Sequence, residues 1–340
     1  MNAILAGSDF LRAPLLATAR PQAFKEWHHF VIHGRGRHIL INFSLNSEPS
    51  GAGRHRLAPR VIVIAHTDRW CGAIQRFDEA VLDVSADLGE LTIGGSRMNV
   101  LPDGYRVIVD LPDQHIRGEL DFVSVSRPFV VNNQPIGEGR MSWLFVPRLR
   151  ADGWLRIGGQ EHRIEHELAY HDHNWGRFRW GDDFGWTWGT VLPQSPDDPW
   201  SMVFLQMTDR ARVNYLSQAL YVWHHDEPAA IFRHAAVRTR SHGVLPGSPD
   251  CTLPPQMRLI LDGQAPGVPE CVKISAERAG DSVHAEFRAR SYARLAQPSE
   301  VSLDRSTVLC EASGTARLTG TVGGELLDFH GAGVFEFLYG

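Results

Sequence analysis

The feature that most constrains the fold is a succession of short runs of β-branched and apolar residues, each ended by turn residues or a polar loop. The runs that we predict to be strands are Arg37–Leu45, Pro59–Thr67, Gly104–Asp113, Ser201–Asp209, Tyr215–His225, Met257–Gly263 and Ser306–Val322. The 32 glycines and 20 prolines separate such runs at intervals typical of antiparallel sheets. Only Phe77–Leu91 leaves a helix open as an alternative. The pattern therefore predicts an all-β protein, a sandwich or a barrel.

The chain has 340 residues, which suits two domains better than one. Ser47–Arg60 is a predicted polar loop rich in Gly, Pro and Arg. Pro193–Trp200 contains three prolines and two aspartates and separates two strand-rich halves. We therefore predict domains at residues 1–192 and 193–340.

Composition excludes several classes of function. A net charge of −5 and a pI near 6.4 argue against a nucleic-acid surface, which needs clustered Lys and Arg. Cys71, Cys251, Cys271 and Cys310 are far apart and form no C-x-x-C pair, which favours reduced thiols in a cytoplasmic protein. We identify no signal peptide and no run of about 18 apolar residues that would span a membrane.

The most informative segment is Tyr170–Gly189, YHDHNWGRFRWGDDFGWTWG, which contains four of the ten tryptophans. If Ala169–Trp175 is a strand, its side chains alternate between two faces. Tyr170, Asp172 and Asn174 then share one face, and His171, His173 and Trp175 share the other. Asp172 and the two histidines are therefore not expected to contact the same ligand.

His171 and His173 form an H-x-H pair that could supply two zinc ligands from a strand. His162, Glu165 and His166 are the candidates for a third ligand, but none has a diagnostic spacing. In a chain with 17 histidines an H-x-H pair also arises by chance. We predict that no metal is bound and that both histidines form hydrogen bonds to backbone groups or carboxylates.

Asp172 is the candidate catalytic acid. Among aromatic residues its carboxyl would be poorly solvated, and burial raises the pKa of an aspartate, so it could stay neutral at pH 7. A neutral acid can protonate an alkene or an enol, and indole faces stabilise a developing carbocation by about 0.5–2 kcal/mol per ring. The structural alternative is a buried aspartate that caps a turn at Asn174–Gly176.

These residues resemble the carotenoid hydratase (hydroxyneurosporene synthase) family. Glu26-Trp27-His28-His29-Phe30 is similar to the E-W-x-x-F motif near the start of that family. Gly104–Asp113, Ile116–Phe122, Ser142–Arg148, Tyr170–Gly176 and Gly185–Gly189 are similar to later segments, so that the resemblance covers roughly the first 190 residues. The remainder agrees only in length and strand content.

The resemblance implies two lipocalin-like antiparallel β-barrels packed side by side. It also implies that Tyr170 and Asp172 correspond to the Tyr-x-Asp pair of the hydratases, which add water to a terminal double bond of acyclic carotenoids. Trp143 corresponds to the family's tryptophan, but its histidine has no match near Arg140–Ser142. This departure points to a non-carotenoid branch, whose members include cyclases and Diels–Alderases.

The leading hypothesis is a cofactor-independent, acid-catalysed hydration or cyclisation of an apolar unsaturated substrate, a terpenoid or polyene. Asp172 would donate the proton and Tyr170 would orient it. We predict a pocket between the two barrels whose substrate-binding residues are Trp143, Asn174, Trp175, Trp186, Trp188, Glu26 and Trp27. Transient contact with a membrane, to collect such a substrate, is compatible with this hypothesis. The alternatives are a pericyclase, which mainly folds its substrate, and a non-catalytic carrier.

Overall fold

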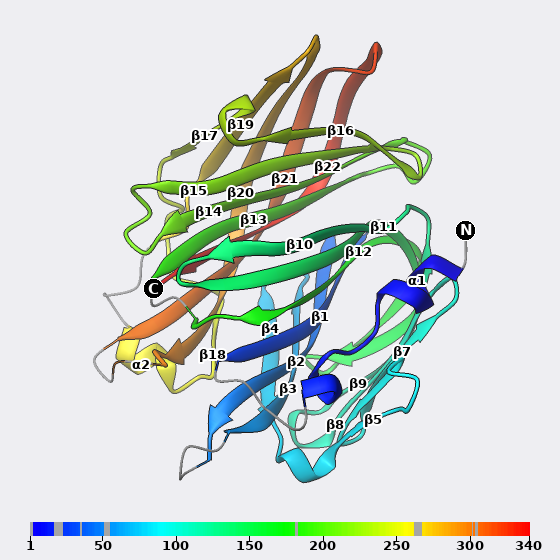
Figure 1. Cartoon of the computed structure of the whole chain (residues 1–340), viewed down its shortest axis with the longest axis vertical. Helices are drawn as coiled ribbons and strands as arrows, with labels where there is room; N and C mark the ends of the chain where they lie inside the picture. The colour runs from blue at the N-terminus through cyan, green and yellow to red at the C-terminus, as the bar shows by residue number, and fades with distance from the viewer. Residues whose placement is uncertain are drawn as a thin grey trace. The chain divides into compact units, whose positions relative to one another are not determined.

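A computed structural model of the chain describes residues 3–16, 23–34, 36–50, 55–180, 183–261, 267–300, 302 and 305–340. Most of this part of the chain is β-strand, and the strands form two large sheets (Figure 1). The pairs that join β5 to β12 in the first sheet and all pairs of the second sheet are antiparallel, except β18 with β20, which is parallel. The predicted all-β class is confirmed.

The first sheet, within the described residues, has twelve strands in the order β4-β3-β2-β1-β12-β11-β9-β8-β7-β6-β5, with β10 paired to β11 beside this path. Their bounds are β1 Phe24–Gly34, β2 Arg37–Pro49, β3 His55–His66, β4 Trp70–Arg76, β5 Leu82–Val84, β6 Glu90–Ile93, β7 Ser96–Leu101, β8 Gly104–Leu111, β9 Ile116–Ser124, β10 Phe129–Ile136, β11 Gly139–Ile157 and β12 Gln160–Arg177. β12 is thus an inner strand between β1 and β11.

Alternation of side chains builds the core of this sheet. In β8, Tyr105, Val107, Val109 and Leu111 are fully buried, whereas the residues between them are more exposed. The same period places Phe30 of β1 in that core. Because strand side chains alternate, each strand presents one apolar face to a common core and one face away from it.

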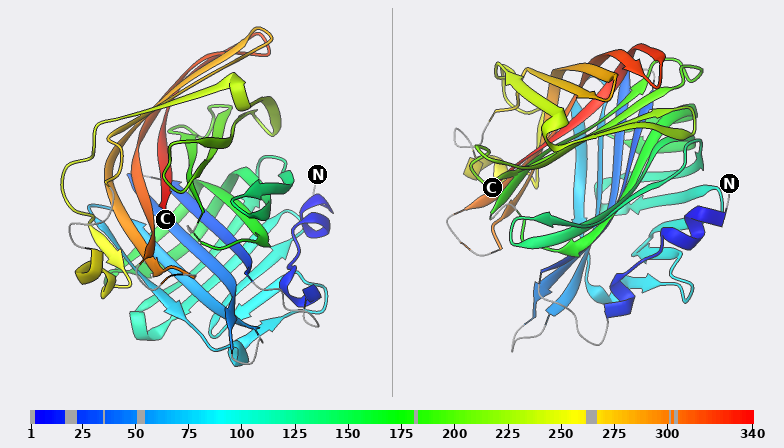
Figure 2. Two further views of the ribbon diagram at one scale, coloured as in Figure 1. Left: turned by 60° about the vertical axis from the view of Figure 1, so that its left-hand side comes forward. Right: turned by 45° about the horizontal axis from the view of Figure 1, so that its top comes forward.

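The second sheet has ten strands among the described residues, in the order β16-β15-β14-β13-β22-β21-β20-β19-β17, with β18 paired to β20. Their bounds are β13 Phe184–Pro193, β14 Trp200–Asp209, β15 Tyr215–His224, β16 Glu227–Arg233, β17 Val237–His242, β18 Cys251–Leu253, β19 Cys271–Arg278, β20 Asp281–Pro298, β21 Ser306–Val322 and β22 Glu325–Tyr339. Figure 2 shows that β20, β21 and β22, coloured orange to red, are long and strongly curved. A separate apolar core that includes Phe204, Phe287 and Phe335 covers one face of this sheet.

Helices are short: α1 Ala3–Ser8, α2 Met257–Leu261 and the 3₁₀ turns η1 Ala13–Leu16, η2 Glu79–Val81, η3 Pro112–Gln114 and η4 His234–Ala236. No helix in the described part of the chain has the length and apolar character needed to cross a bilayer.

Two predictions of local structure need correction, and one open alternative is decided. Met257–Leu261 is helical instead of a strand because Met257 and Leu261, four residues apart, are both buried on one helix face. The rest of Met257–Gly263 lies outside the described residues. Phe77–Leu91, for which the sequence leaves a helix open as an alternative, forms η2, β5 and the start of β6. The predicted loop Ser47–Arg60 is shorter, since β2 extends to Pro49 and β3 begins at His55; residues 51–54 lie outside the described part.

Contacts divide the chain into two compact units. The first unit comprises Met1–Ile32, Ile39–Ala65 and Cys71–Arg179, and the second comprises His33–His38, His66–Trp70 and Trp180–Gly340. β13 pairs with β14 and β22, so Phe184–Pro193 is part of the second sheet, although it lies before the proline-rich segment at which we predict the domain boundary. All four cysteines are among the described residues, and none forms a disulfide.

Candidate functional site

The candidate site lies on β12, whose central part is buried on both faces of the first sheet. Every residue from Glu167 to Asn174 is buried. The strand assignment establishes the alternation that the sequence predicts. One face of this segment carries Tyr170, Asp172 and Asn174, and the other carries His171 and His173.

Asp172 is hydrogen-bonded by its two neighbours on the same face. The hydroxyl of Tyr170 donates to Asp172 Oδ2 over 2.9 Å, and Asn174 Nδ2 donates to Asp172 Oδ1 over 2.5 Å. Asp172 is 5% exposed and Tyr170 is fully buried. These contacts link residues two positions apart along one strand, so local backbone geometry holds the Tyr170–Asp172–Asn174 group together.

Aromatic side chains adjoin this group across the sheet. Phe145 and Trp143 of β11 lie directly opposite Asp172 and Asn174, and residues opposite one another in an antiparallel pair project from the same face. Their ring centroids are 4.3 Å apart, and both side chains are buried. Neither ring belongs to the apolar core of the first unit. Asp172 therefore lies on a buried, partly aromatic face that is distinct from the core.

The opposite face of β12 carries a buried histidine–carboxylate cluster. His171 Nε2 lies 3.1 Å from Asp9 Oδ2, and His173 Nδ1 lies 2.5 Å from Asp9 Oδ1. The hydroxyl of Tyr105 donates to Asp9 Oδ2 over 2.7 Å. His28 of β1 stacks on His173 with ring centroids 3.7 Å apart. Asp9 follows α1, so the N-terminal segment supplies the carboxylate at the centre of this cluster.

Glu26 completes the attachment of the N-terminal segment. Its carboxylate accepts the amide N–H groups of Arg12 and Ala13, each over 2.7 Å, and contacts His173 Nε2 at 2.9 Å. The Arg12 guanidinium lies 3.8 Å from the ring centroid of Trp175, which is cation–π geometry. Both histidines thus contact carboxylates, and His171 also contacts a backbone oxygen, which are the kinds of partner that the sequence predicts for them.

The ionisation states in this cluster follow from burial and charge. Burial raises the pKa of Asp9, but the charge of His173 and hydrogen bonds from His171 and His173 outweigh it and hold that pKa well below its usual range. Burial lowers the pKa of His173, but Asp9 and Glu26 outweigh it and raise the pKa overall. Burial lowers the pKa of His28 and of His171. These shifts favour the ionised form of Asp9 and the protonated form of His173, and they disfavour protonation of His28 and His171.

The structure separates some of the predicted site residues. Trp27 projects from the Asp172 side of the sheet, because Glu26 and His28, on either side of it in β1, contact His173. Glu26 and Trp175 lie on the histidine side, away from the Asp172 face. Trp186 and Trp188 are buried in β13 of the second unit, and their predicted position beside Asp172 stays a prediction.

The third metal ligands considered from the sequence do not join the H-x-H pair. His166 is exposed and contacts Asp152, 3.1 Å from Nδ1 to Oδ2, and Glu165 is also exposed. Sequence reasoning missed Asp9, His28 and Tyr105 as members of the cluster. Glu26-Trp27-His28 was the only usable signal, because alternation on a strand places Glu26 and His28 on one face.

The second unit has its own buried acidic pair. Glu311 of β21 and Glu336 of β22 are directly opposite one another, and both are buried. Trp186 Nε1 donates a hydrogen bond to Glu336 Oε1. Burial raises the pKa of Glu336 to about 7, although hydrogen bonds with Glu311 and Trp186 act to lower it.

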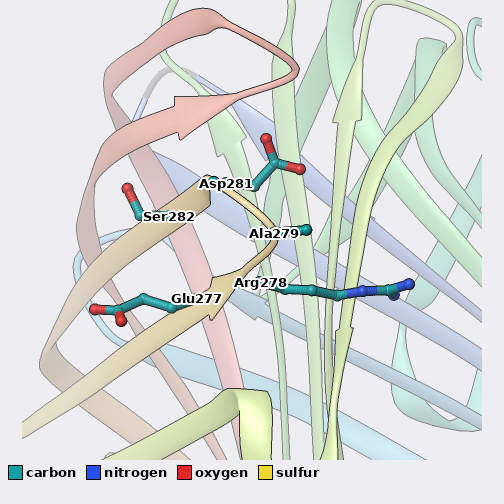
Figure 3. Close-up of a pocket in the computed structure, with 6 residues that line it drawn as sticks. Glu277, Arg278, Ala279, Asp281 and Ser282 are labelled. Carbon is teal, nitrogen blue, oxygen red and sulfur yellow. The ribbon is translucent and has the colours of Figure 1, made fainter.

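A surface pocket lies at the turn between β19 and β20, and its lining residues are Glu277, Arg278, Ala279, Gly280, Asp281 and Ser282 (Figure 3). The carboxylates of Glu277 and Asp281 point in different directions in this view. Asp281 Oδ1 accepts a hydrogen bond from the amide N–H of Gly323. The Asp281 carboxylate therefore stabilises the turn that contains Gly323. None of the predicted site residues lines this pocket.

Comparison with known proteins gives likeness in structure alone. No protein-family model matches the chain, and no curated protein sequence matches it. An AttH-type protein from Nitrosomonas europaea has a TM-score of 0.62 at 12% identity, covering 93% of this chain and 92% of that one. Kievitone hydratase from Nectria haematococca has a TM-score of 0.58 at 12% identity, covering 93% of this chain and 88% of that one. CghA in complex with Sch210972 has a TM-score of 0.60 at 14% identity, covering 94% and 89%. The chain therefore shares the lipocalin-like, two-sheet fold of these proteins over nearly its whole length.

Proposed function

We propose that this chain is an enzyme that hydrates or cyclises an apolar, unsaturated small molecule of the terpenoid or polyene class, without a cofactor, and that Asp172 donates the proton. The observation that carries the proposal is the Tyr170–Asp172–Asn174 group, buried beside Trp143 and Phe145. A hydratase among the proteins of similar fold supports the reaction class.

Proton donation by Asp172 requires a rearrangement of its hydrogen bonds. Tyr170 and Asn174 both donate to its carboxyl, an arrangement that suits the ionised form, whereas burial favours the neutral form. A protonated Asp172 needs one acceptor in place of a donor. Rotation of the Tyr170 hydroxyl or a flip of the Asn174 amide supplies one without moving the backbone.

The proposed step transfers the Asp172 proton to one carbon of a substrate double bond and leaves a carbocation at the other carbon. Aromatic faces such as that of Trp143 stabilise this charge by about 0.5–2 kcal/mol per ring. Addition of water followed by loss of a proton gives hydration, whereas attack by an internal alkene followed by loss of a proton gives cyclisation. In both cases Asp172 regains a proton before the next cycle.

The same contacts support a pericyclase as the second candidate. If Asp172 stays ionised, as its two donors favour, it can orient Tyr170 and Asn174 toward a substrate carbonyl without giving up a proton. Catalysis would then come mainly from holding a polyene in a reactive conformation. A carrier that binds the same ligand unchanged would show no turnover.

The test is turnover of acyclic terpenoid and polyene substrates by the wild type, Asp172→Asn and Glu167→Gln, the last neutralising a buried carboxylate of the same strand. We expect Asp172→Asn to lower kcat by at least ~100-fold with little change in ligand affinity, because only the proton donor is lost. Deuterium from heavy water should appear at a substrate carbon. Turnover without deuterium uptake, and with a rate that survives Asp172→Asn, would establish the pericyclase instead.

A further inference from the structure

On the histidine side of β12, both ring nitrogens of His171 face hydrogen-bond acceptors. His171 Nδ1 lies 3.1 Å from the backbone oxygen of His29, and His171 Nε2 lies 3.1 Å from Asp9 Oδ2. Both partners are hydrogen-bond acceptors. A neutral imidazole carries only one N–H group. In that form only one of the two contacts is a hydrogen bond, and the other ring nitrogen presents a lone pair that a proton or a metal ion can bind.

His28 presents a second feature at the same place. Its side chain is 1% exposed, and among the described residues neither ring nitrogen has a hydrogen-bond partner. A buried imidazole without a partner loses the hydration of both nitrogens, which is costly. The ring lies against His173 and faces the cluster.

The atoms involved are close enough to bind one ion. A nitrogen of His28, a nitrogen of His171 and a carboxylate oxygen of Asp9 all lie within 4.8 Å of one another. A tetrahedral zinc ion with bonds of about 2.1 Å holds its ligand atoms roughly 3.4 Å apart. The three side chains would therefore have to close by at most about 1.4 Å, which small rotations can supply.

From this geometry we propose that Asp9, His28 and His171 bind one Zn²⁺ ion in the core of the first unit. Two imidazoles and one carboxylate are a donor set that zinc uses with three protein ligands. The ion would bind the ring nitrogen of His171 that faces Asp9, and it would give His28 a partner. It would also join the N-terminal segment, through Asp9, to β1 and β12.

The surroundings of the three residues fit this role. Metal-bound histidines usually donate their other N–H to a carbonyl or carboxylate, as His171 Nδ1 can to the oxygen of His29. Tyr105 and His173 contact the Asp9 carboxylate and orient it. The site lies on the opposite face of β12 from Asp172, so it does not depend on the proposed reaction.

The experiment is metal analysis of the full chain, expressed without a histidine tag in zinc-supplemented medium, for the wild type and for Asp9→Asn, His28→Gln and His33→Gln. His33 is the matched control: it lies on the same strand as His28, is equally buried, and has two ring nitrogens without a partner among the described residues. We expect one zinc per chain in the wild type and in His33→Gln, and at least ~100-fold weaker zinc binding in the other two variants.

Thermal unfolding with and without added Zn²⁺ provides a readout that does not depend on activity. After removal of metal, Zn²⁺ should raise the unfolding midpoint of the wild type and of His33→Gln, but not of Asp9→Asn. If His28→Gln does not fold, Asp9→Asn tests the site alone. Wild type that contains no zinc after growth in supplemented medium would overturn the proposal. Equal zinc content in Asp9→Asn and the wild type would also overturn it.

Discussion

The buried pair Glu311–Glu336 in the second unit predicts a pH-dependent stability that one substitution should remove. Burial raises the pKa of Glu336 from 4.5 to about 7. Because this value exceeds that of the unfolded chain, the native state holds an extra proton between pH 4.5 and about 7. The contribution to stability is therefore fully present below pH 4.5 and is lost as the pH rises to about 7.

The magnitude follows from the size of the shift. One pKa unit corresponds to 1.36 kcal/mol, so ionising Glu336 in the folded protein should lower the free energy of unfolding by an amount on the order of 3 kcal/mol. Glu336→Gln keeps a carbonyl oxygen that can accept from Trp186 Nε1 but cannot ionise. We expect the variant to resemble the wild type near pH 5 and to be more stable at pH 8 by up to about 3 kcal/mol.

Urea unfolding at pH 5 and pH 8, followed by tryptophan fluorescence and by amide exchange of β21 and β22, measures this difference. Glu325→Gln, which changes an exposed glutamate at the start of the same strand, is the control and should follow the wild type at both pH values. If the wild type and Glu336→Gln change stability in parallel between pH 5 and pH 8, the folded-state pKa of Glu336 is not raised to about 7, which refutes this prediction.

Three further predictions concern β12. Tyr170→Phe removes the hydroxyl that donates to Asp172 and should lower kcat ~10–100-fold with little effect on KM, measured by steady-state kinetics; an unchanged kcat would contradict the role of Tyr170. Gly176→Ala would place a methyl group against the backbone oxygen of Arg140 and should lower the free energy of unfolding by about 2 kcal/mol in urea titrations, unless β11 shifts to accommodate it. The pKa of His173 is raised in the folded protein, so protonation of His173 stabilises the fold fully below pH 6.5, and this stabilisation is lost as the pH rises through the pKa of the folded state. The free energy of unfolding of His173→Gln, measured against pH, should lack this decline. A decline of equal size in the variant would show that His173 is not its cause.

Part of the site could be predicted because it depends only on local geometry. A strand has a period of two, so Ala169–Trp175 places Tyr170, Asp172 and Asn174 on one face wherever that strand lies in the sheet. The hydrogen bonds from Tyr170 and Asn174 to Asp172 join residues two positions apart. The sequence also indicated that His171 and His173 project from the other face.

Contacts between distant segments could not be predicted in this way. The sequence hypothesis assigned Glu26 to the substrate pocket because motif resemblance does not report which face a residue occupies. It also assigned Trp175 to that pocket, although alternation along the strand already placed Trp175 on the face opposite Asp172. In the structure Glu26 holds the amides of Arg12 and Ala13, and Trp175 lies under Arg12. Both therefore support the N-terminal segment on the histidine side of β12.

The amino-acid sequence by itself determined the all-β class and the two faces of β12, because both follow from the alternation of apolar and polar residues along each strand. Only the tertiary structure decided that Asp9 reaches His171 across 162 positions of the chain, that His28 stacks on His173, and that Glu311 lies opposite Glu336. The physical reason is that strand pairing and register depend on the packing of the whole core, whose free energy is summed over residues far apart in the chain.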